Sequence, residues 1–260
     1  MRLEKVCKVY NIGLASETVV LHDIDLTLEK GQFLALTGPS GSGKSTLLNI
    51  VGLLDKPTSG RLFIKGQDTS QLRDGAITNL RGHTIGFVFQ DHHLISAFTA
   101  LENVMMPLLA DRGFPGPEIT ERALDLMAQV GLEKVSGNLA MNMSGGQQQR
   151  VAICRALSQQ PQLILADEPI ASLDPHNARL VMEALRTVNR QDGLTVLTCL
   201  HHLDAARAWC DRVIAMQAGR IVFDGAPTQL TSDRVFDIYG VTEEEFHADH
   251  APAAQAQHGS

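Results

Sequence analysis

The sequence predicts an α/β fold, on three observations. Residues 33–37 are a compact apolar run, typical of a strand buried on both faces, and they lead through a glycine-rich loop into residues 47–54, which have helical character. Residues 91–160 look helical. After Pro161 the pattern returns to the order strand, helix, strand.

Local periodicity justifies the individual elements. Residues 19–28 end in an alternation of apolar and polar side chains, which indicates a strand, and residues 29–32 then turn the chain. In residues 118–132, apolar side chains recur at three- and four-residue spacing and give one apolar helix face. The glycines and prolines of residues 111–117 break any helix before it. The last three elements are expected at residues 163–166 (strand), 175–190 (helix) and 194–200 (strand).

Composition argues against several classes of protein. The 260 residues include 22 Lys and Arg against 29 Asp and Glu, a formal charge of −7, and 44% are hydrophobic. Such a chain is long enough for one large or two small folded domains. A net acidic chain is a poor candidate for coating nucleic acid, which needs a basic face, and an aromatic content of 5% disfavours base stacking.

The sequence predicts neither a membrane span nor an exported protein. No run approaches the ~20 consecutive apolar residues of a spanning helix, and residues 1–6 lack an apolar signal-peptide core. The four cysteines are scattered, which favours a reduced, cytosolic protein over a zinc site or a disulfide scaffold. The polar composition of residues 241–260 predicts a solvated, disordered tail in preference to a histidine metal site.

Residues 38–45 fit the pattern G-x-x-x-x-G-K-[ST] at every fixed position. Such a loop wraps a polyphosphate with backbone N–H groups at a helix start, and glycines permit the close approach. Lys44 is expected to reach the β- and γ-phosphates, and Ser45 to bind Mg²⁺. A chance match is disfavoured because the loop lies between a buried strand and a helix. The predicted nucleotide-binding loop consists of Gly38, Pro39, Ser40, Gly41, Ser42, Gly43, Lys44, Ser45 and Thr46.

Two acids follow the apolar strand at residues 163–166. Asp167 and Glu168 would cost several kcal/mol if they were interior and unpaired, so we expect them at the carboxyl end of the strand, facing solvent or an ion. Asp167 fits the role of holding Mg²⁺ through water, and Glu168 that of a base or orienter for the attacking water. The alternative is a pair of turn acids before Pro169.

Residues 143–150, Met-Ser-Gly-Gly-Gln-Gln-Gln-Arg, resemble the signature sequence of ABC transporter ATPases. The resemblance covers residues 1 to about 240, and the motifs stand in the family's order. It implies an α/β P-loop NTPase of ABC type, with a mixed sheet core, an antiparallel β edge and an inserted α-helical subdomain at about residues 91–160. It also implies ATP hydrolysis coupled to transport, with ATP and Mg²⁺ as cofactors.

The resemblance implies roles for further residues. Tyr10 would stack on the adenine, and Gln90 would be the Q-loop glutamine, which senses Mg²⁺ and the membrane partner. Asp174 belongs to the segment that resembles a D-loop, residues 172–174. His201 would be the switch histidine that positions water against Glu168, although a lone histidine at a strand end is more often structural. The implied catalytic residues are Glu168, His201 and Lys44, the implied metal ligands are Ser45, Gln90 and Asp167, and the implied signature contacts to nucleotide are Ser144, Gly145, Gly146 and Gln147.

ATPases of this family resemble one another in working as head-to-tail dimers. The residues before the helical run 147–157 are consistent with that arrangement. Ser144, Gly145 and Gly146 open the helical run 147–157, so that backbone N–H groups and the helix dipole form an anion site. One chain thus has two phosphate-binding helix starts, and a dimer in which each completes the other's site explains why both exist. The simpler role of Ser144 as a helix N-cap holds in either case.

The sequence departs from the family's pattern at a few positions. Met143 stands where Leu is usual, and residues 169–171 differ from the common Pro-Thr-Gly or Pro-Thr-Ser. His202 occupies a position that is usually Asp, which puts in doubt any role borrowed from that Asp. Residues with no motif around them are interpreted as packing or surface residues: His92, His93, Cys154 and Trp209.

Two parts of the sequence resemble different subfamilies. Residues 86–94 and 98–109 resemble the lipoprotein-release and macrolide-efflux type, which works with FtsX-like permeases. Residues 144–174, 200–202 and 222–240 instead resemble phosphonate-importer ATPases. Residues after the Q-loop face the membrane subunit in this family, so we favour the release type, with phosphonate or phosphate import as the alternative. The resemblance also implies separate permease subunits and a peripheral location at the cytoplasmic face of the membrane.

ABC ATPases without transport partners form a different class. DNA-repair types carry long coiled-coil insertions, and this chain has no heptad run and no basic arm. Ribosomal types usually fuse two ATPase halves, whereas one set of motifs occurs here. A regulatory ATPase that acts through a membrane subunit would use the same Q-loop surface and remains an alternative.

Overall fold

The computed structural model describes residues 1–113, 116–201 and 203–240. The strands are β1 (Arg2–Tyr10), β2 (Thr18–Thr27), β3 (Phe33–Thr37), β4 (Ser59–Ile64), β5 (Gln67–Asp68), β6 (Ile85–Val88), β7 (Leu163–Asp167), β8 (Thr195–Cys199), β9 (Arg212–Gln217) and β10 (Arg220–Gly225). The helices are α1 (Lys44–Val51), α2 (Asp74–Gly82), α3 (Ala100–Arg112), α4 (Pro117–Gln129), α5 (Gly145–Leu157), α6 (Pro175–Asp192), α7 (Leu203–Trp209) and α8 (Ser232–Tyr239). Short 3₁₀ turns occupy Thr69–Gln71, Glu133–Val135, Ala140–Asn142 and Pro227–Gln229.

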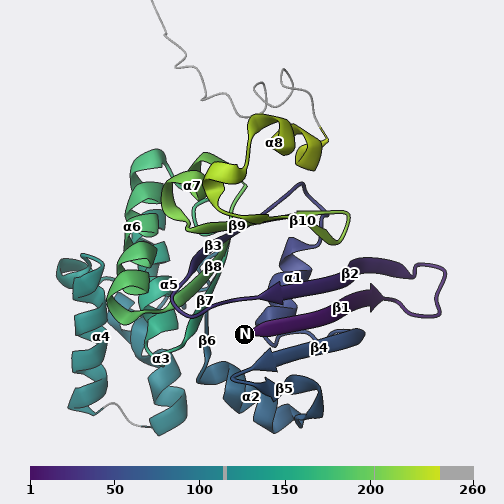
Figure 1. Cartoon of the computed structure of the whole chain (residues 1–260). Coiled ribbons are helices and arrows are strands. Elements are labelled where there is room, and N and C mark those ends of the chain that lie inside the picture. Colours follow the sequence, from purple (N-terminus) through teal and green to yellow (C-terminus); the bar gives the residue numbers. More distant parts are fainter. Residues whose placement is uncertain (114–115, 202, 241–260) are drawn as a thin grey trace, which may run out of the picture.

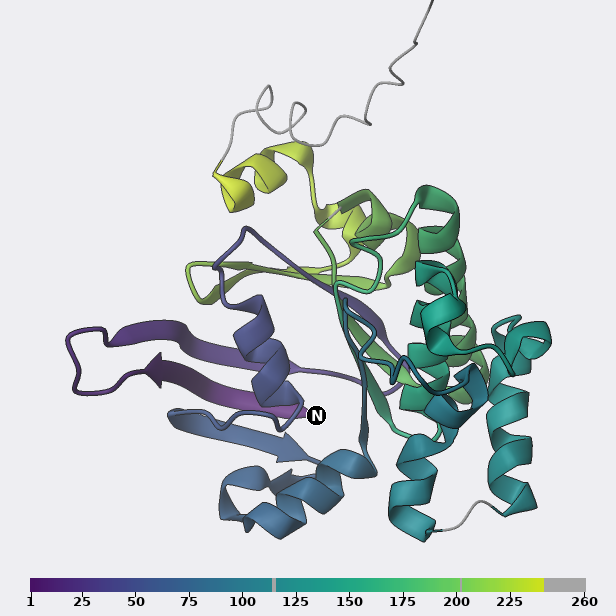
Figure 2. The same ribbon diagram turned by 180° about the vertical axis from the view of Figure 1, so that it is seen from behind.

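These elements form three layers, of which the middle one is a six-stranded sheet (Figures 1 and 2). The strand order of the central sheet is β10-β9-β3-β8-β7-β6. On one face lie α1 and a second sheet, with order β2-β1-β4-β5, and on the other face lie the helices α3 to α6. Among the described residues, no helix has the length and apolarity needed to cross a membrane.

The central sheet is buried on both sides because its inner strands are mostly apolar. In β3, Phe33 and Ala35 belong to the core under the helices, whereas Leu34 and Leu36 belong to the core under α1 and the second sheet. Strands β6, β7, β8, β3 and β9 run parallel, and β10 pairs antiparallel with β9. The mixed sheet with an antiparallel edge is therefore confirmed.

The observed boundaries differ slightly from those that periodicity predicts. The strand at residues 33–37 is as expected. Helix α1 begins at Lys44, earlier than the apolar run at residue 47, because the phosphate loop ends at Gly43 and passes directly into the helix. Helix α4 ends at Gln129, because Gly131 adopts the left-handed conformation with φ 69°. Helices α3, α4 and α5 lie between β6 and β7 in the chain, in the region expected to be helical.

A buried asparagine shapes the loop that leads into α3. Asn103 is 1% exposed, and its Oδ1 accepts a hydrogen bond from Ile95 N at 2.8 Å. Its Nδ2 donates to Ile95 O at 3.1 Å and to Thr99 O at 2.9 Å. One side chain thus binds the loop at both of its ends, and its Oδ1 supplies the acceptor for the N–H of Ile95. The loop 95–99 is held by this residue and by the capping box of Thr99 and Glu102 at the start of α3.

We expect Asn103→Ala to lower the free energy of unfolding by about 2 kcal/mol, because it removes a buried side chain and leaves the N–H of Ile95 without its acceptor. Asn138→Ala, at an exposed position, is the matched control and should change it little. Urea unfolding of both variants measures the difference. Equal stabilities of the two variants would show that Asn103 does not hold the loop.

Candidate functional site

The phosphate loop, the two acids and His201 meet at one edge of the central sheet. Strand β8 lies between β3 and β7, with Cys199 opposite both Leu36 and Asp167. The residues that follow these parallel strands therefore leave the sheet side by side. The structure brings together Gly38 after β3, Glu168 after β7 and His201 after β8, as the order of motifs predicts.

The phosphate loop requires glycine at its first position. Gly38 has φ 136°, and a Cβ there would lie 2.1 Å from Met216 O of β9, so that a larger residue cannot fit. The loop ends at Gly43, which precedes α1 and has no side chain to cap the helix. The first N–H groups of α1 can therefore serve an anion bound by the loop.

Lys44 is folded back onto the loop that it follows. Its Nζ donates to Gly38 O at 2.8 Å and to Pro39 O at 2.9 Å, and the residue is 7% exposed. Burial lowers the pKa of Lys44, and the nearby Glu168 and Asp167 oppose that shift. The Ser42 hydroxyl is buried and has no hydrogen-bond partner among the described residues. A buried ammonium group and a spare hydroxyl within a glycine loop fit the phosphates of a nucleotide.

Glu168 and His201 contact each other beside a small cavity. Nε2 of His201 and Oε1 of Glu168 are directly hydrogen-bonded, and both residues line a cavity of about 240 Å³. Glu168 has φ 48°, a conformation that is uncommon for a residue with a side chain and that recurs at active sites. Its carboxylate accepts the hydrogen bond and so orients the imidazole. This pair can hold and activate a water molecule.

Asp167 and Ser45 are the residues that could hold a metal ion with the nucleotide. Burial raises the pKa of Asp167, a shift that a nearby cation would reverse. Ser45, in the first turn of α1, is exposed. Because Mg²⁺ in nucleotide sites is commonly held by one or two side chains and the phosphates, these two oxygen ligands suit it.

Gln90 and Asp174 are joined through the loop between β7 and α6. Nε2 of Gln90 donates to Ser172 Oγ at 3.3 Å. Asp174 caps α6 by accepting from Asn177 N at 3.0 Å and from its Nδ2 at 2.6 Å. These hydrogen bonds, first of all that from the Asn177 side chain, lower the pKa of Asp174. The segments resembling a Q-loop and a D-loop are therefore adjacent.

The signature segment begins a helix in a different part of the fold. The Ser144 side chain caps α5 by accepting a hydrogen bond from Gln147 N. The Oε1 of Gln147 in turn accepts a hydrogen bond from Ser144 N. A Cβ on Gly146 would lie 2.2 Å from Asn177 Oδ1, so that α5 and α6 approach closely there. Helix α5 packs in the core under the helices, whereas α1 packs in the core on the opposite face of the central sheet. The two expected phosphate-binding helix starts therefore do not share one core.

Sequence reasoning missed a set of contacts between the Q-loop and α5. His92 was expected to be a packing or surface residue, but its Nε2 donates to Gly145 O at 2.9 Å. Arg155 Nη2 donates to His92 O at 2.7 Å, and its Nη1 donates to His93 O. His92 and His93 both have positive φ, 61° and 49°. No sequence pattern announces these contacts, because they join residues more than 50 positions apart.

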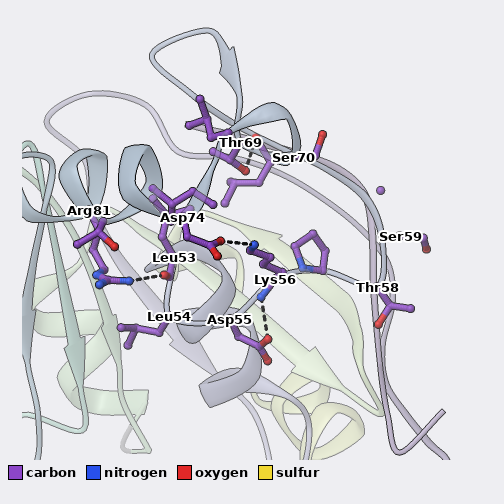
Figure 3. A pocket seen from close by; sticks show the side chains of 16 residues that line it. Leu53, Leu54, Asp55, Lys56, Thr58, Ser59, Thr69, Ser70, Asp74 and Arg81 are labelled. Atoms are coloured by element: carbon purple, nitrogen blue, oxygen red, sulfur yellow. Dashed lines mark hydrogen bonds and ion pairs between the residues drawn. The ribbon is translucent and has the colours of Figure 1, made fainter.

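Tyr10 ends β1 and is held by a neighbouring acid. Its hydroxyl donates to Asp55 Oδ2 at 2.8 Å, and the Lys8 ammonium lies 4.8 Å from the ring centroid. Asp55 also lines a hollow of about 590 Å³ between the end of α1, β4 and α2 (Figure 3). In that hollow Lys56 pairs with Asp74 and Arg81 donates to Leu53 O, while the phosphate loop and Glu168 are not among its lining residues.

The remaining sequence predictions concern single residues. Cys154 is buried, and burial raises the pKa of its thiol to about 12, which makes it a packing residue as expected. Trp209 packs against the core under the helices. His202 and the predicted tail at residues 241–260 lie outside the described residues.

Comparison with known proteins identifies relatives along most of the chain. The profile described as "ABC transporter" matches residues 21–171. The lipoprotein-releasing system ATP-binding protein LolD 1 of Rhodopseudomonas palustris is 58% identical over 221 residues, which cover 85% of this chain and 97% of that protein. The phosphonates import ATP-binding protein PhnC of Rhizobium johnstonii is 42% identical over 250 residues, which cover 93% of this chain and 87% of that protein.

A solved structure has the same fold. A dimeric ATP-binding cassette in a post-hydrolysis state, bound to ADP and Pi, superposes with a TM-score of 0.78 and 41% sequence identity. The match covers 87% of this chain and 98% of that one. The fold expected from the signature segment is therefore confirmed.

We expect Gly146→Ala to lower the free energy of unfolding by about 1–3 kcal/mol, because the new methyl group overlaps Asn177 and pushes α5 from α6. Gly145→Ala is the matched control: its methyl group meets only the end of the Leu173 side chain, at 3.3 Å. Urea unfolding compares the two. If both alanines were tolerated equally, the close approach of α5 and α6 would not be a constraint on this position.

Proposed function

The chain belongs to the ABC transporter family, and from that premise we propose that it is the ATP-hydrolysing subunit of a lipoprotein-releasing transporter. The observation that carries the proposal is the 58% identity to a lipoprotein-releasing ATPase along 97% of that relative. A second such relative, from Anaeromyxobacter dehalogenans, is 55% identical over 208 residues. The ATPase activity is that of the family. The lipoprotein cargo and the location at the cytoplasmic face of the membrane are the proposal.

Hydrolysis is assigned to the residues at the edge of the central sheet. Lys44 and the N–H groups at the start of α1 bind the phosphates. Glu168 accepts a proton from the attacking water, and His201, hydrogen-bonded to Glu168, fixes that carboxylate and contacts the γ-phosphate. Mg²⁺ held by Ser45, Gln90 and Asp167 would neutralise charge that develops on the phosphates. Tyr10, anchored by Asp55, would stack on the adenine.

We further propose that two copies of the chain enclose the nucleotides head to tail. Ser144 is the exposed N-cap of α5, and the chain's own phosphate loop does not use the N–H groups and dipole at this helix start. The dimeric relative bound to ADP and Pi supports this arrangement. In the proposed dimer, the nucleotide held by the partner's phosphate loop would contact Ser144, Gly145, Gly146 and Gln147. Asp174 would lie close to that nucleotide.

An exposed apolar surface beside the Q-loop is the proposed contact with the permease. Ile95 is 40% exposed and Phe98 36%, and Leu139 and Met141 beside them are 37% and 61% exposed. The two segments are joined, since Ala140 N donates to Phe98 O at 2.9 Å and Thr99 forms a β-bridge with Leu139. Contiguous exposed apolar side chains commonly mark an interaction site, and this one adjoins Gln90 through the loop that Asn103 holds.

Phosphonate import is a second candidate, because the phosphonates import relative aligns with 93% of this chain, more than the 85% of the lipoprotein-releasing one. Its lower identity, 42%, makes it the weaker candidate. Regulation through a membrane subunit, without transport, would use the same apolar surface, and the partner that co-purifies separates these cases.

We expect Glu168→Gln to bind ATP normally and to accumulate as an ATP-bound dimer, with hydrolysis slowed by roughly 10²- to 10⁴-fold, because the general base is lost. Lys44→Ala should instead weaken ATP binding, because it removes a charge that the phosphates contact. Fluorescent-nucleotide binding, gel filtration with ATP and phosphate release separate the two variants. Turnover of Glu168→Gln near the wild-type rate would contradict the assignment.

We expect the tagged chain, purified from native membranes, to bring down a permease, and the ATPase of that complex to be stimulated by a lipoprotein but not by a phosphonate. Phe98→Asp with Met141→Asp should abolish co-purification, because it places charges in the apolar contact. Val222→Asp, at a residue that is 47% exposed on β10, is the control and should retain the permease. Stimulation by a phosphonate alone, or a soluble partner, would refute the lipoprotein-release proposal.

A further inference from the structure

Tyr239, the last residue of α8, reaches from the C-terminal helix to the catalytic edge of the sheet. Its hydroxyl lies 2.7 Å from Oγ1 of Thr37 and 3.5 Å from the carbonyl oxygen of His201. Thr37 is the residue immediately before Gly38 and is 1% exposed. One phenol therefore joins the start of the phosphate loop to the backbone of the residue that contacts Glu168.

The chemistry of the three groups allows both contacts at once. A phenol can accept one hydrogen bond and donate another. If the Thr37 hydroxyl donates to the phenolic oxygen, the phenolic proton is left for the His201 carbonyl, which can only accept. A phenol keeps its proton at neutral pH, and burial raises the pKa of Tyr239 further.

The helix that presents Tyr239 is anchored independently of these contacts. Val235 and Ile238 are buried, 2% and 6% exposed, in the core under the helices. Nε2 of Gln217, at the end of β9, donates to Asp237 O at 3.1 Å. Figure 1 shows α8 beyond β9 and β10, next to α7. The phenol thus projects from a fixed support.

The Tyr239 bridge lies just beyond the point where the pairing of β3 with β8 ends. Leu200 N donates to Leu36 O at 3.1 Å, where β3 and β8 end. Beyond that bond the two chains separate, one into the phosphate loop and the other into the loop that carries His201. Tyr239 spans them at the next residue of each, Thr37 and His201.

We propose that Tyr239 is a positioning residue for ATP hydrolysis, which sets the distance between the phosphate loop and His201. The proposal rests on the catalytic role proposed above for His201 and adds a second requirement, that the C-terminal helix be docked. The proposal assigns Tyr239 no direct contact with the nucleotide or the attacking water. Its hydroxyl should therefore affect the rate of hydrolysis and not the binding of ATP.

The test removes single hydroxyl groups. Tyr239→Phe and Thr37→Val each keep the shape of the side chain, and each should lower kcat by about 3- to 10-fold, the effect of losing one buried hydrogen bond, with an unchanged KM for ATP. The double variant should be no slower than the slower single one, because both changes break the same bridge. Gln217→Leu removes a hydrogen bond to the same helix away from the site and should leave kcat unchanged.

Several results would overturn the proposal: wild-type kcat in Tyr239→Phe, multiplying losses in the double variant, or an equal loss in Gln217→Leu, which would indicate a general need for helix docking. A raised KM with unchanged kcat would also overturn it. His201→Ala separates the two levels of the argument. If it loses hydrolysis while Tyr239→Phe does not, the role of His201 stands and the bridge fails. If neither loses hydrolysis, the catalytic assignment fails as well.

Discussion

Burial of the central sheet on both faces is the constraint on which the rest of the structure depends. Apolar side chains from β3 alternate between two cores, one under α3 to α6 and one under α1 and the second sheet. Charged groups can therefore be accommodated only at or beyond the ends of the inner strands. Because the strands are parallel, their carboxyl ends lie at the same edge of the sheet. Gly38, Glu168 and His201 are therefore neighbours, although more than 30 residues separate each from the next in the chain.

The same sheet divides the nucleotide-binding elements. Helix α1 and its phosphate loop belong to one face, whereas α5 and the signature segment belong to the other. The dimer proposed above would join the signature segment of one copy to the phosphate loop of the other, and it agrees with this division.

The segments proposed to respond to a permease are linked by contacts between residues distant in the chain. Arg155 and His92 join the loop after Gln90 to the start of α5, and Gln90 contacts Ser172 in the loop before α6. The apolar surface of Ile95, Phe98, Leu139 and Met141 adjoins that loop. A permease helix bound there would contact the loop after Gln90. That loop lies against both the catalytic edge of the sheet and the signature helix. The left-handed conformations of His92 and His93 show that this segment is held in its shape by its contacts.

The sequence by itself determined the elements whose chemistry is local. The phosphate loop, the acids after β7 and the capped signature helix depend on residues within eight or so positions of one another, and so do the strand at residues 33–37 and the helix face of α4. Their patterns follow from backbone geometry and periodicity. The resemblance to the ABC ATPases then added the order of the motifs.

Only the tertiary structure decided how those pieces meet. Asn177 against Gly146, Arg155 on the carbonyl of His92, Asp55 on Tyr10 and Tyr239 between Thr37 and His201 all join segments far apart in the chain. None of them has a sequence signature, because a steric contact or a hydrogen bond needs only two groups that packing brings together. Short sequence motifs thus determine which functional groups the site contains, and the packing of the two cores determines how those groups lie relative to one another.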